Sequence, residues 1–150
     1  IEALIAVMDE DPGIAVASPM PRCAPAVVAR LLEGARQGKP GSATVVTNQR
    51  GDALYFSRRV LPWVAGEPAA VTVFQHIGVY AYRAEALARY ARLEPCDTEL
   101  AEGLEQLRFL HASVPIRMAE IAEPPGGLRE INHPADVALA EAGLRVRGLT

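Results

Sequence analysis

Apolar residues recur along this chain with two different periods, and the two periods predict helices and strands in alternation. Spacings of three and four predict helices near the N-terminus, over 25–36, 84–93 and 98–111, and from about 134 to 145. Short runs rich in Val, Ile and aromatic residues predict strands over 14–18, 43–47, 53–56, 71–83 and 116–121. The turn at 48–52 joins two of these strands in an antiparallel hairpin. The order predicts an α/β fold with a mixed sheet.

Polar aromatic side chains gather in two stretches, Ala53–Trp63 and Gln75–Arg83. These stretches hold the one Trp, three of the four Tyr, a His and several Arg, in a chain with 5% aromatic residues. Aromatic and charged groups beside a glycine are typical of a binding-site wall. The two stretches are therefore the first candidates for a site.

Alternation along the predicted strand 71–83 indicates which of its side chains share a face. His76, Gly78, Tyr80 and Tyr82 are expected on one face, and the apolar residues between them on the core side. The glycine leaves room for a ligand, and the imidazole and phenol offer hydrogen bonds on either side of it. For an arbitrary strand, a half-exposed sheet face or a subunit interface is the commoner explanation.

Three further polar residues adjoin predicted elements. Arg58 follows the strand 53–56, and a guanidinium at a strand end can hold a carboxylate through two hydrogen bonds. Glu105 and Gln106 lie in the helix predicted over 98–111, beside its apolar stripe. Each of the three has a simpler explanation as a solvated polar residue.

Composition narrows the classes of function. The chain has 150 residues and a net charge of -3, and its 15 basic residues are scattered, which argues against a nucleic-acid partner. No apolar run approaches the roughly 20 residues that span a bilayer, so we expect a soluble cytoplasmic protein. Cys23 and Cys96 are expected to be reduced thiols. There is no glycine-rich phosphate loop and no Gly-x-Ser-x-Gly elbow.

A metal site is not indicated by spacing alone. Glu130, His133 and Asp136 are close in sequence, but the spacing of a helical histidine pair is missing. Asn132 before Pro134 is explained as a helix start.

Three motifs resemble the 3-deoxy-manno-octulosonate cytidylyltransferase (CMP-Kdo synthetase) family in order and spacing. They are Ala53-Leu-Tyr-Phe-Ser-Arg58 with Pro62-Trp63, then His76-Ile-Gly-Val-Tyr80-Ala-Tyr-Arg83, then Leu104-Glu-Gln-Leu-Arg108. The resemblance implies transfer of CMP from CTP to the sugar acid Kdo, with Mg²⁺, in lipopolysaccharide biosynthesis. It also implies a cytoplasmic homodimer and a nucleotide-diphospho-sugar transferase fold, a three-layer α/β sandwich.

Carried over position by position, the resemblance assigns five residues to the sugar-acid pocket: Arg58, His76, Tyr80, Glu105 and Gln106. It implies direct attack of the anomeric oxygen on the α-phosphorus of CTP. Positioning then dominates catalysis. No residue of this chain is expected to act as a nucleophile.

The chain departs from the family pattern in three places. The N-terminal half, with its nucleotide loop and a magnesium-binding aspartate, has no counterpart before Ile1, so we expect 1–150 to be one domain, the C-terminal sugar-binding and dimerisation part of a longer enzyme. Asn132 stands where the family has an aspartate that binds the metal, and a neutral oxygen holds magnesium less strongly. Thr44 stands where a lysine is expected.

Other hypotheses remain at this point. The chain can belong to a non-catalytic relative that acts as a binding or dimerisation module, which Asn132 favours. It can also be part of a cytidylyltransferase that acts on another sugar acid. It can also be an unrelated α/β domain with an incidental aromatic face.

Overall fold

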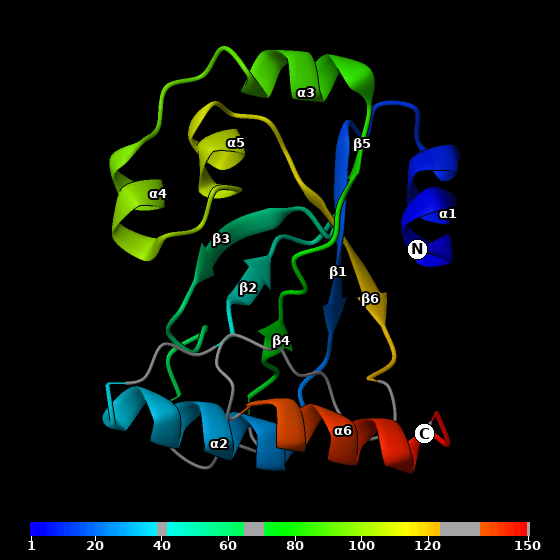
Figure 1. Cartoon of the computed structure of the whole chain (residues 1–150). Helices are drawn as coiled ribbons and strands as arrows, with labels where there is room; N and C mark the ends of the chain where they lie inside the picture. Colours follow the sequence, from blue (N-terminus) through cyan, green and yellow to red (C-terminus); the bar gives the residue numbers. More distant parts are fainter. Residues whose placement is uncertain (39–41, 65–70, 124–135, 150) are drawn as a thin grey trace.

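The computed structural model describes residues 1–38, 42–64, 71–123 and 136–149. In chain order the elements are α1 (Glu2–Glu10), β1 (Val16–Pro21), α2 (Pro25–Arg36), β2 (Thr44–Thr47), β3 (Ala53–Ser57), β4 (Phe74–Gln75), β5 (Ala81–Tyr82), α3 (Ala84–Tyr90), α4 (Asp97–Glu102), α5 (Leu107–His111), β6 (Arg117–Ile121) and α6 (Asp136–Val146). Helices α3, α4 and α5 gather at one end of the molecule, and α2 and α6 at the other (Figure 1).

The strands form two sheets of three. In the first, of order β5-β1-β6, β1 runs parallel to β6 and antiparallel to β5. In the second, of order β3-β2-β4, both pairings are antiparallel. Every residue of β1 is buried, as expected for a central strand covered on both faces. The predicted α/β class with a mixed sheet is confirmed.

The predicted hairpin is formed by β2 and β3. Its turn depends on Asn48, whose side-chain oxygen accepts hydrogen bonds from the backbone N–H groups of Arg50 (2.8 Å) and Asp52 (3.0 Å). Gly51 takes a positive φ of 82° there, which glycine adopts without steric strain. The end of the hairpin places Arg58 directly after β3.

Two apolar clusters hold the elements together. The larger joins both sheets to α5, and its fully buried members include Val16, Phe56 and Ile116. The smaller packs α1 on the first sheet through residues that include Leu4, Met8 and Ala17.

The long strand predicted over 71–83 is wrong. The chain leaves the second sheet after Gln75 and joins the first sheet at Ala81, so the segment between them belongs to neither. This change of sheet breaks the two-residue period. Val79, expected on the core side, is 43% exposed, whereas Tyr80 packs against the larger cluster.

The single helix predicted over 98–111 is also wrong. It is two short helices, α4 and α5, separated at Gly103, which takes a left-handed φ of 62°. A residue in this conformation ends a helix. The break moves Glu105 and Gln106 from a helical face into the turn between the helices.

Candidate functional site

A cavity of about 240 Å³ lies between the end of β3, the segment 76–80 and the turn between α4 and α5. All five residues that the resemblance assigns to the sugar acid line it: Arg58, His76, Tyr80, Glu105 and Gln106. Its wall is completed by Ala43, Gly78, Gly103 and Leu104. Residues from three distant parts of the sequence therefore meet at one place.

Arg58 is anchored to the end of α4. Its Nε donates to the carbonyl oxygen of Glu102 (2.9 Å), and its Nη2 donates to that of Gly103 (3.2 Å). The Glu102 carboxylate accepts the backbone N–H of Arg58 (2.9 Å) and the hydroxyl of Ser57 (2.7 Å). Nη1 has no hydrogen-bond partner among the described residues. A positioned cation with a free N–H group suits an anionic ligand.

His76 is buried and neutral. The residue is 5% exposed, and its ring packs edge to face against Phe56, with 4.9 Å between ring centroids. Burial lowers the pKa of His76 to about 4, because the charged imidazolium would lose its hydration. Its Nε2 lies 3.0 Å from the hydroxyl oxygen of Ser18. Near neutral pH the ring is therefore a hydrogen-bonding group and not a cation.

Tyr80 begins a row of aromatic rings that leads away from His76. Its ring centroid is 5.5 Å from that of His76 and 5.4 Å from that of Tyr82, on which it stacks. Burial raises the pKa of the Tyr80 phenol. The hydroxyl is therefore protonated and can both donate and accept a hydrogen bond.

Gln106 carries a buried donor without a partner. In the described part of the chain, its Nε2 is the one buried side-chain nitrogen or oxygen that makes no hydrogen bond. Such a group costs about 1–3 kcal/mol unless something pairs with it. Gln106 lines the cavity, so a small rotation of its buried amide toward the cavity would let a ligand oxygen accept this hydrogen bond and remove the cost.

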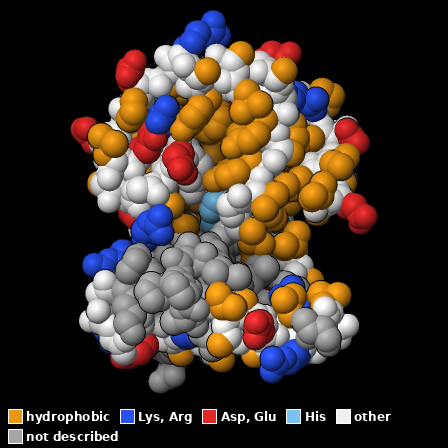
Figure 2. Space-filling model, viewed as in Figure 1, with side chains coloured by type: hydrophobic (Ala, Val, Ile, Leu, Met, Phe, Trp, Pro, Cys, Tyr) orange, Lys and Arg blue, Asp and Glu red, His pale blue; other side chains and the backbone are white. Residues whose placement is uncertain are grey.

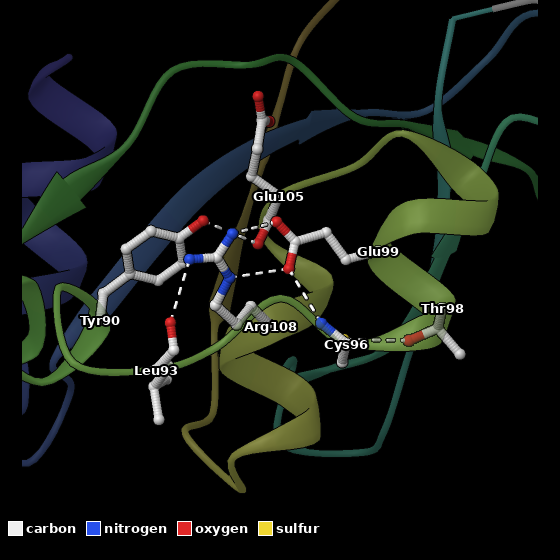
Figure 3. A network of polar contacts seen from close by, with 7 residues as sticks. All are labelled: Tyr90, Leu93, Cys96, Thr98, Glu99, Glu105 and Arg108. Carbon is white, nitrogen blue, oxygen red and sulfur yellow. Dashed lines mark hydrogen bonds and ion pairs between the residues drawn. The ribbon is translucent and has the colours of Figure 1, made fainter.

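A network of polar contacts braces the turn that carries Glu105 and Gln106 (Figure 3). Arg108 Nε donates to Glu99 Oε2 at 2.7 Å, and Arg108 Nη2 donates to Glu99 Oε1. Hydrogen bonding to Arg108 lowers the pKa of the Glu99 carboxyl. The sequence indicated Arg108 as part of a motif but did not predict its pairing with Glu99. The two residues are nine positions apart, and side chains on one helix pair at spacings of three or four.

The same network reaches α3. The Arg108 guanidinium lies over the Tyr90 ring, 4.5 Å from its centroid, and donates to the carbonyl oxygen of Leu93 (3.2 Å). The Tyr90 hydroxyl contacts the carbonyl oxygen of Glu105 at 3.4 Å. The Glu105 carboxylate points away from the ion pair in Figure 3, and its side chain is exposed.

A second, mainly apolar cavity of about 250 Å³ adjoins the first. The two share Tyr80, Glu105 and Gln106 as lining residues. Figure 2 shows hydrophobic side chains gathered over the end of the molecule that holds α3 and α5. The predicted aromatic wall is thus present, but Trp63 is 82% exposed and lines neither cavity.

Thr44, at the position where a lysine was expected, has a structural role. Its buried hydroxyl donates to the carbonyl oxygen of Arg59 (2.7 Å) and accepts the N–H of Leu61 (2.9 Å). These bonds hold the segment that follows Arg58.

The predicted metal position, Asn132, lies outside the described residues, as do Glu130 and His133. Within the described ranges, no group of three or more His, Cys, Asp or Glu is arranged to hold a metal ion. None of the helices described here is long and apolar enough to cross a membrane. Cys23 and Cys96 are not joined by a disulfide.

Comparison with known proteins agrees with the motifs. A family model described as cytidylyltransferase matches residues 28–118. Proteins named 3-deoxy-manno-octulosonate cytidylyltransferase are similar to this chain. The protein from Dichelobacter nodosus is 46% identical over 105 residues, which cover 69% of this chain and 42% of the relative. The protein from Maricaulis maris is 33% identical over 138 residues, which cover 92% of this chain and 53% of the relative. The protein from Escherichia coli is 35% identical over 128 residues, which cover 85% of this chain and 48% of the relative.

A solved structure is similar over nearly the whole chain. It is described as CMP:2-keto-3-deoxy-manno-octonic acid synthetase complexed with CTP, and it matches with a TM-score of 0.76 and 33% identity. The match covers 99% of this chain and 56% of that one. It confirms the predicted nucleotide-diphospho-sugar transferase fold. The chain spans about half the length of the curated relatives it matches.

Proposed function

This chain belongs to the cytidylyltransferase family, and we propose that it forms the sugar-acid-binding part of an enzyme that makes CMP-Kdo and pyrophosphate from CTP and Kdo. The observation that carries the proposal is that Arg58, His76, Tyr80, Glu105 and Gln106 line one cavity.

The cavity is chemically complementary to a hydroxylated carboxylic acid. The free N–H group of Arg58 suits the carboxylate, and the neutral His76 ring and the Tyr80 phenol suit hydroxyl groups. Gln106 Nε2 supplies a further donor, and the exposed Glu105 carboxylate a further acceptor. We therefore assign these five residues to substrate binding and none to covalent catalysis.

In the proposed reaction, the anomeric hydroxyl oxygen of the sugar acid attacks the α-phosphorus of CTP. The bond from that phosphorus to the pyrophosphate oxygen breaks, and the anomeric oxygen loses its proton. The residues around the cavity bind the sugar acid and orient its anomeric oxygen, so their contribution is positioning. Because the chain spans about half the length of its relatives, we assign to it the sugar-acid side of the active site.

Magnesium belongs to the proposal through the resemblance. The described residues contain no cluster that would hold it, and Asn132 is the position that the resemblance assigns to the metal. An amide oxygen is a weaker ligand for Mg²⁺ than a carboxylate. A homodimer, a cytoplasmic location and a place in lipopolysaccharide biosynthesis rest on the same resemblance.

The proposal is tested by incubating the full-length protein with CTP, Kdo and Mg²⁺ and following CMP-Kdo by ³¹P NMR. We expect product with the unaltered protein and strong loss with Arg58→Ala. Absence of product at high enzyme concentration overturns the proposal. Product from a different sugar acid under the same conditions would correct the substrate.

Asn132 favours a second candidate, a non-catalytic binding or dimerisation module. The substitution Asn132→Asp distinguishes the active enzyme from the non-catalytic module. If the enzyme is active, the variant should reach half-maximal rate at a lower Mg²⁺ concentration. If both forms lack activity and still bind Kdo by calorimetry, the binding module is the better description.

A further inference from the structure

Ser18, in the buried strand β1, does not line the cavity itself but contacts the segment 76–79 that forms one wall of it. Its hydroxyl oxygen lies 3.0 Å from His76 Nε2, 2.9 Å from the carbonyl oxygen of Val79 and 3.1 Å from that of Ile77. Ser18 is fully buried, so no water competes for these contacts. One hydroxyl thus ties together three points of the segment 76–79.

The two carbonyl contacts decide the direction of the hydrogen bond to the ring. A serine hydroxyl has one hydrogen, and a carbonyl oxygen can only accept. If the hydroxyl donated to Nε2, its lone pairs would face the carbonyl oxygens of Ile77 and Val79. The Ile77 oxygen would keep the backbone N–H of Val79 (2.7 Å) as a donor, whereas the Val79 oxygen would lose the hydrogen bond from Ser18. The contacts are satisfied when the hydroxyl points its one hydrogen at the carbonyl oxygens, with the shorter contact to Val79 (2.9 Å), and Nε2–H donates to the Ser18 oxygen.

This assignment leaves one free lone pair on the ring. His76 is neutral, so a proton on Nε2 means that Nδ1 is unprotonated. Ser18 is the one polar side chain that bonds the ring within the described part of the chain. Nδ1 is therefore available as an acceptor on a ring that lines the cavity.

We propose that Ser18 is a positioning residue, which holds His76 in its Nε2–H tautomer so that Nδ1 accepts a hydrogen bond from a hydroxyl group of the ligand. The identity of the ligand as a sugar acid rests on the proposed function, whereas the tautomer does not. With Gln106 as a donor and His76 as an acceptor, the cavity has both polarities that a hydroxylated ligand needs.

The tautomer is measured by ¹⁵N NMR of the histidine ring nitrogens in the ligand-free protein at pH 7.5. His76 is identified by the signals that vanish in His76→Gln. We expect a protonated Nε2 and an unprotonated Nδ1, and a protonated Nδ1 overturns the proposal. In Ser18→Ala, we expect a substantial fraction of the Nδ1–H tautomer, and an unchanged single Nε2–H tautomer overturns the role of Ser18.

Two further variants serve as a backup and as a control for the tautomer measurement. Ser18→Cys keeps the size of the side chain but has a weak hydrogen-bonding thiol, so it should shift the tautomer even if Ser18→Ala fails to fold. Ser57→Ala removes another buried hydroxyl, whose hydrogen bond is made to Glu102 and not to the ring, and should leave the tautomer unchanged. An equal shift in Ser57→Ala would overturn the assignment to Ser18.

Kinetics test the consequence for the ligand. Ser18→Ala should raise KM for the sugar acid about five-fold, the loss expected for one hydrogen bond, while KM for CTP stays unchanged. An unchanged KM for the sugar acid, in a variant whose tautomer has shifted, overturns the contact between Nδ1 and the ligand. If the protein makes no CMP-Kdo at all, the proposed function fails and the NMR result still decides the tautomer.

Discussion

Arg108 and Glu99 form an ion pair with two hydrogen bonds that joins α5 to α4 on either side of the turn carrying Glu105 and Gln106. The side chains are 17% and 8% exposed, so the pair is shielded from water and salt. Because Arg108 also contacts Tyr90, the pair fixes the turn relative to α3. This ion pair thus lies beside the cavity and not in it.

We predict that Arg108→Gln impairs sugar-acid binding without touching the ligand. Loss of the ion pair frees the turn, so Glu105 and Gln106 lose their orientation. KM for the sugar acid should rise about ten-fold, because small displacements of positioning groups are costly. Steady-state kinetics with the full-length enzyme measure this, and KM for CTP should be nearly unchanged.

Arg22 offers a matched control for Arg108. It pairs with Glu120 at 3.2 Å, but these side chains are 58% and 49% exposed. Arg22→Gln should change neither KM nor the melting temperature appreciably, since exposed ion pairs contribute little. Arg108→Lys, which retains the charge and loses the two-bond geometry, should be intermediate. Equal effects of Arg22→Gln and Arg108→Gln would contradict a positioning role.

Gly103 provides a second prediction about the same turn. Its φ of 62° is left-handed, so Gly103→Ala should destabilise the fold by about 1–2 kcal/mol. The same change should raise KM for the sugar acid, because Arg58 donates to the Gly103 carbonyl oxygen. Urea denaturation and kinetics measure the two effects.

Gly34 is the corresponding control glycine. It lies within α2, and an added Cβ would meet nothing within 4 Å. Gly34→Ala should therefore stabilise the protein by up to about 1 kcal/mol, the difference in helix propensity. If both glycine variants shift the free energy of unfolding in the same direction, the conformational argument for Gly103 is wrong.

The turn at Gly103 shows how far local sequence patterns reach. Apolar spacing continues across 98–111 and predicts one helix, although an isolated glycine in such a pattern is itself a signal of a helix end. The strand 71–83 fails differently, since no local pattern reports that Gln75 and Ala81 pair with different sheets. In contrast, α2 and the β2–β3 hairpin follow the prediction closely, because their start, turn and periodicity are all local.

The sequence indicated residues that line one cavity, but it did not indicate how they are arranged there. Arg58 and Glu102 are 44 residues apart, and Ser18 and His76 are 58 apart, so only the fold reveals these contacts. The five cavity residues were identified by resemblance to a family, which carries information about distant contacts that periodicity lacks. Trp63 shows that composition alone does not identify site residues, since this aromatic side chain was expected in the binding-site wall and is exposed.

His76 predicts how stability depends on pH. Burial depresses its pKa from 6.5 to about 4, so the unfolded chain binds a proton between these values and the folded chain does not. The free energy of unfolding should therefore fall as pH drops from 6.5 to 4, by about 3 kcal/mol from this group. Above pH 6.5 the histidine is neutral in both the folded and the unfolded chain, so the free energy of unfolding no longer changes with pH through this group.

The variant His76→Gln should remove that dependence. Denaturation measured from pH 4 to pH 8 should give a flatter curve for this variant than for the unaltered protein. His111→Gln, which changes an exposed histidine, should leave the curve as it was. The assignment fails if His111→Gln flattens the curve as much as His76→Gln does.

Gln106 leads to a prediction in which stability and binding change in opposite directions. Its unpaired Nε2 is buried in the free protein, so an apolar residue of similar size removes the cost of that donor. Gln106→Met should therefore raise the free energy of unfolding by about 1–3 kcal/mol while it weakens sugar-acid binding. Gln49→Met, at an exposed position, should change neither quantity. Denaturation and calorimetric titration with Kdo measure the pair of effects. A Gln106→Met protein that is less stable and binds Kdo normally would show that Gln106 serves the fold and not the ligand.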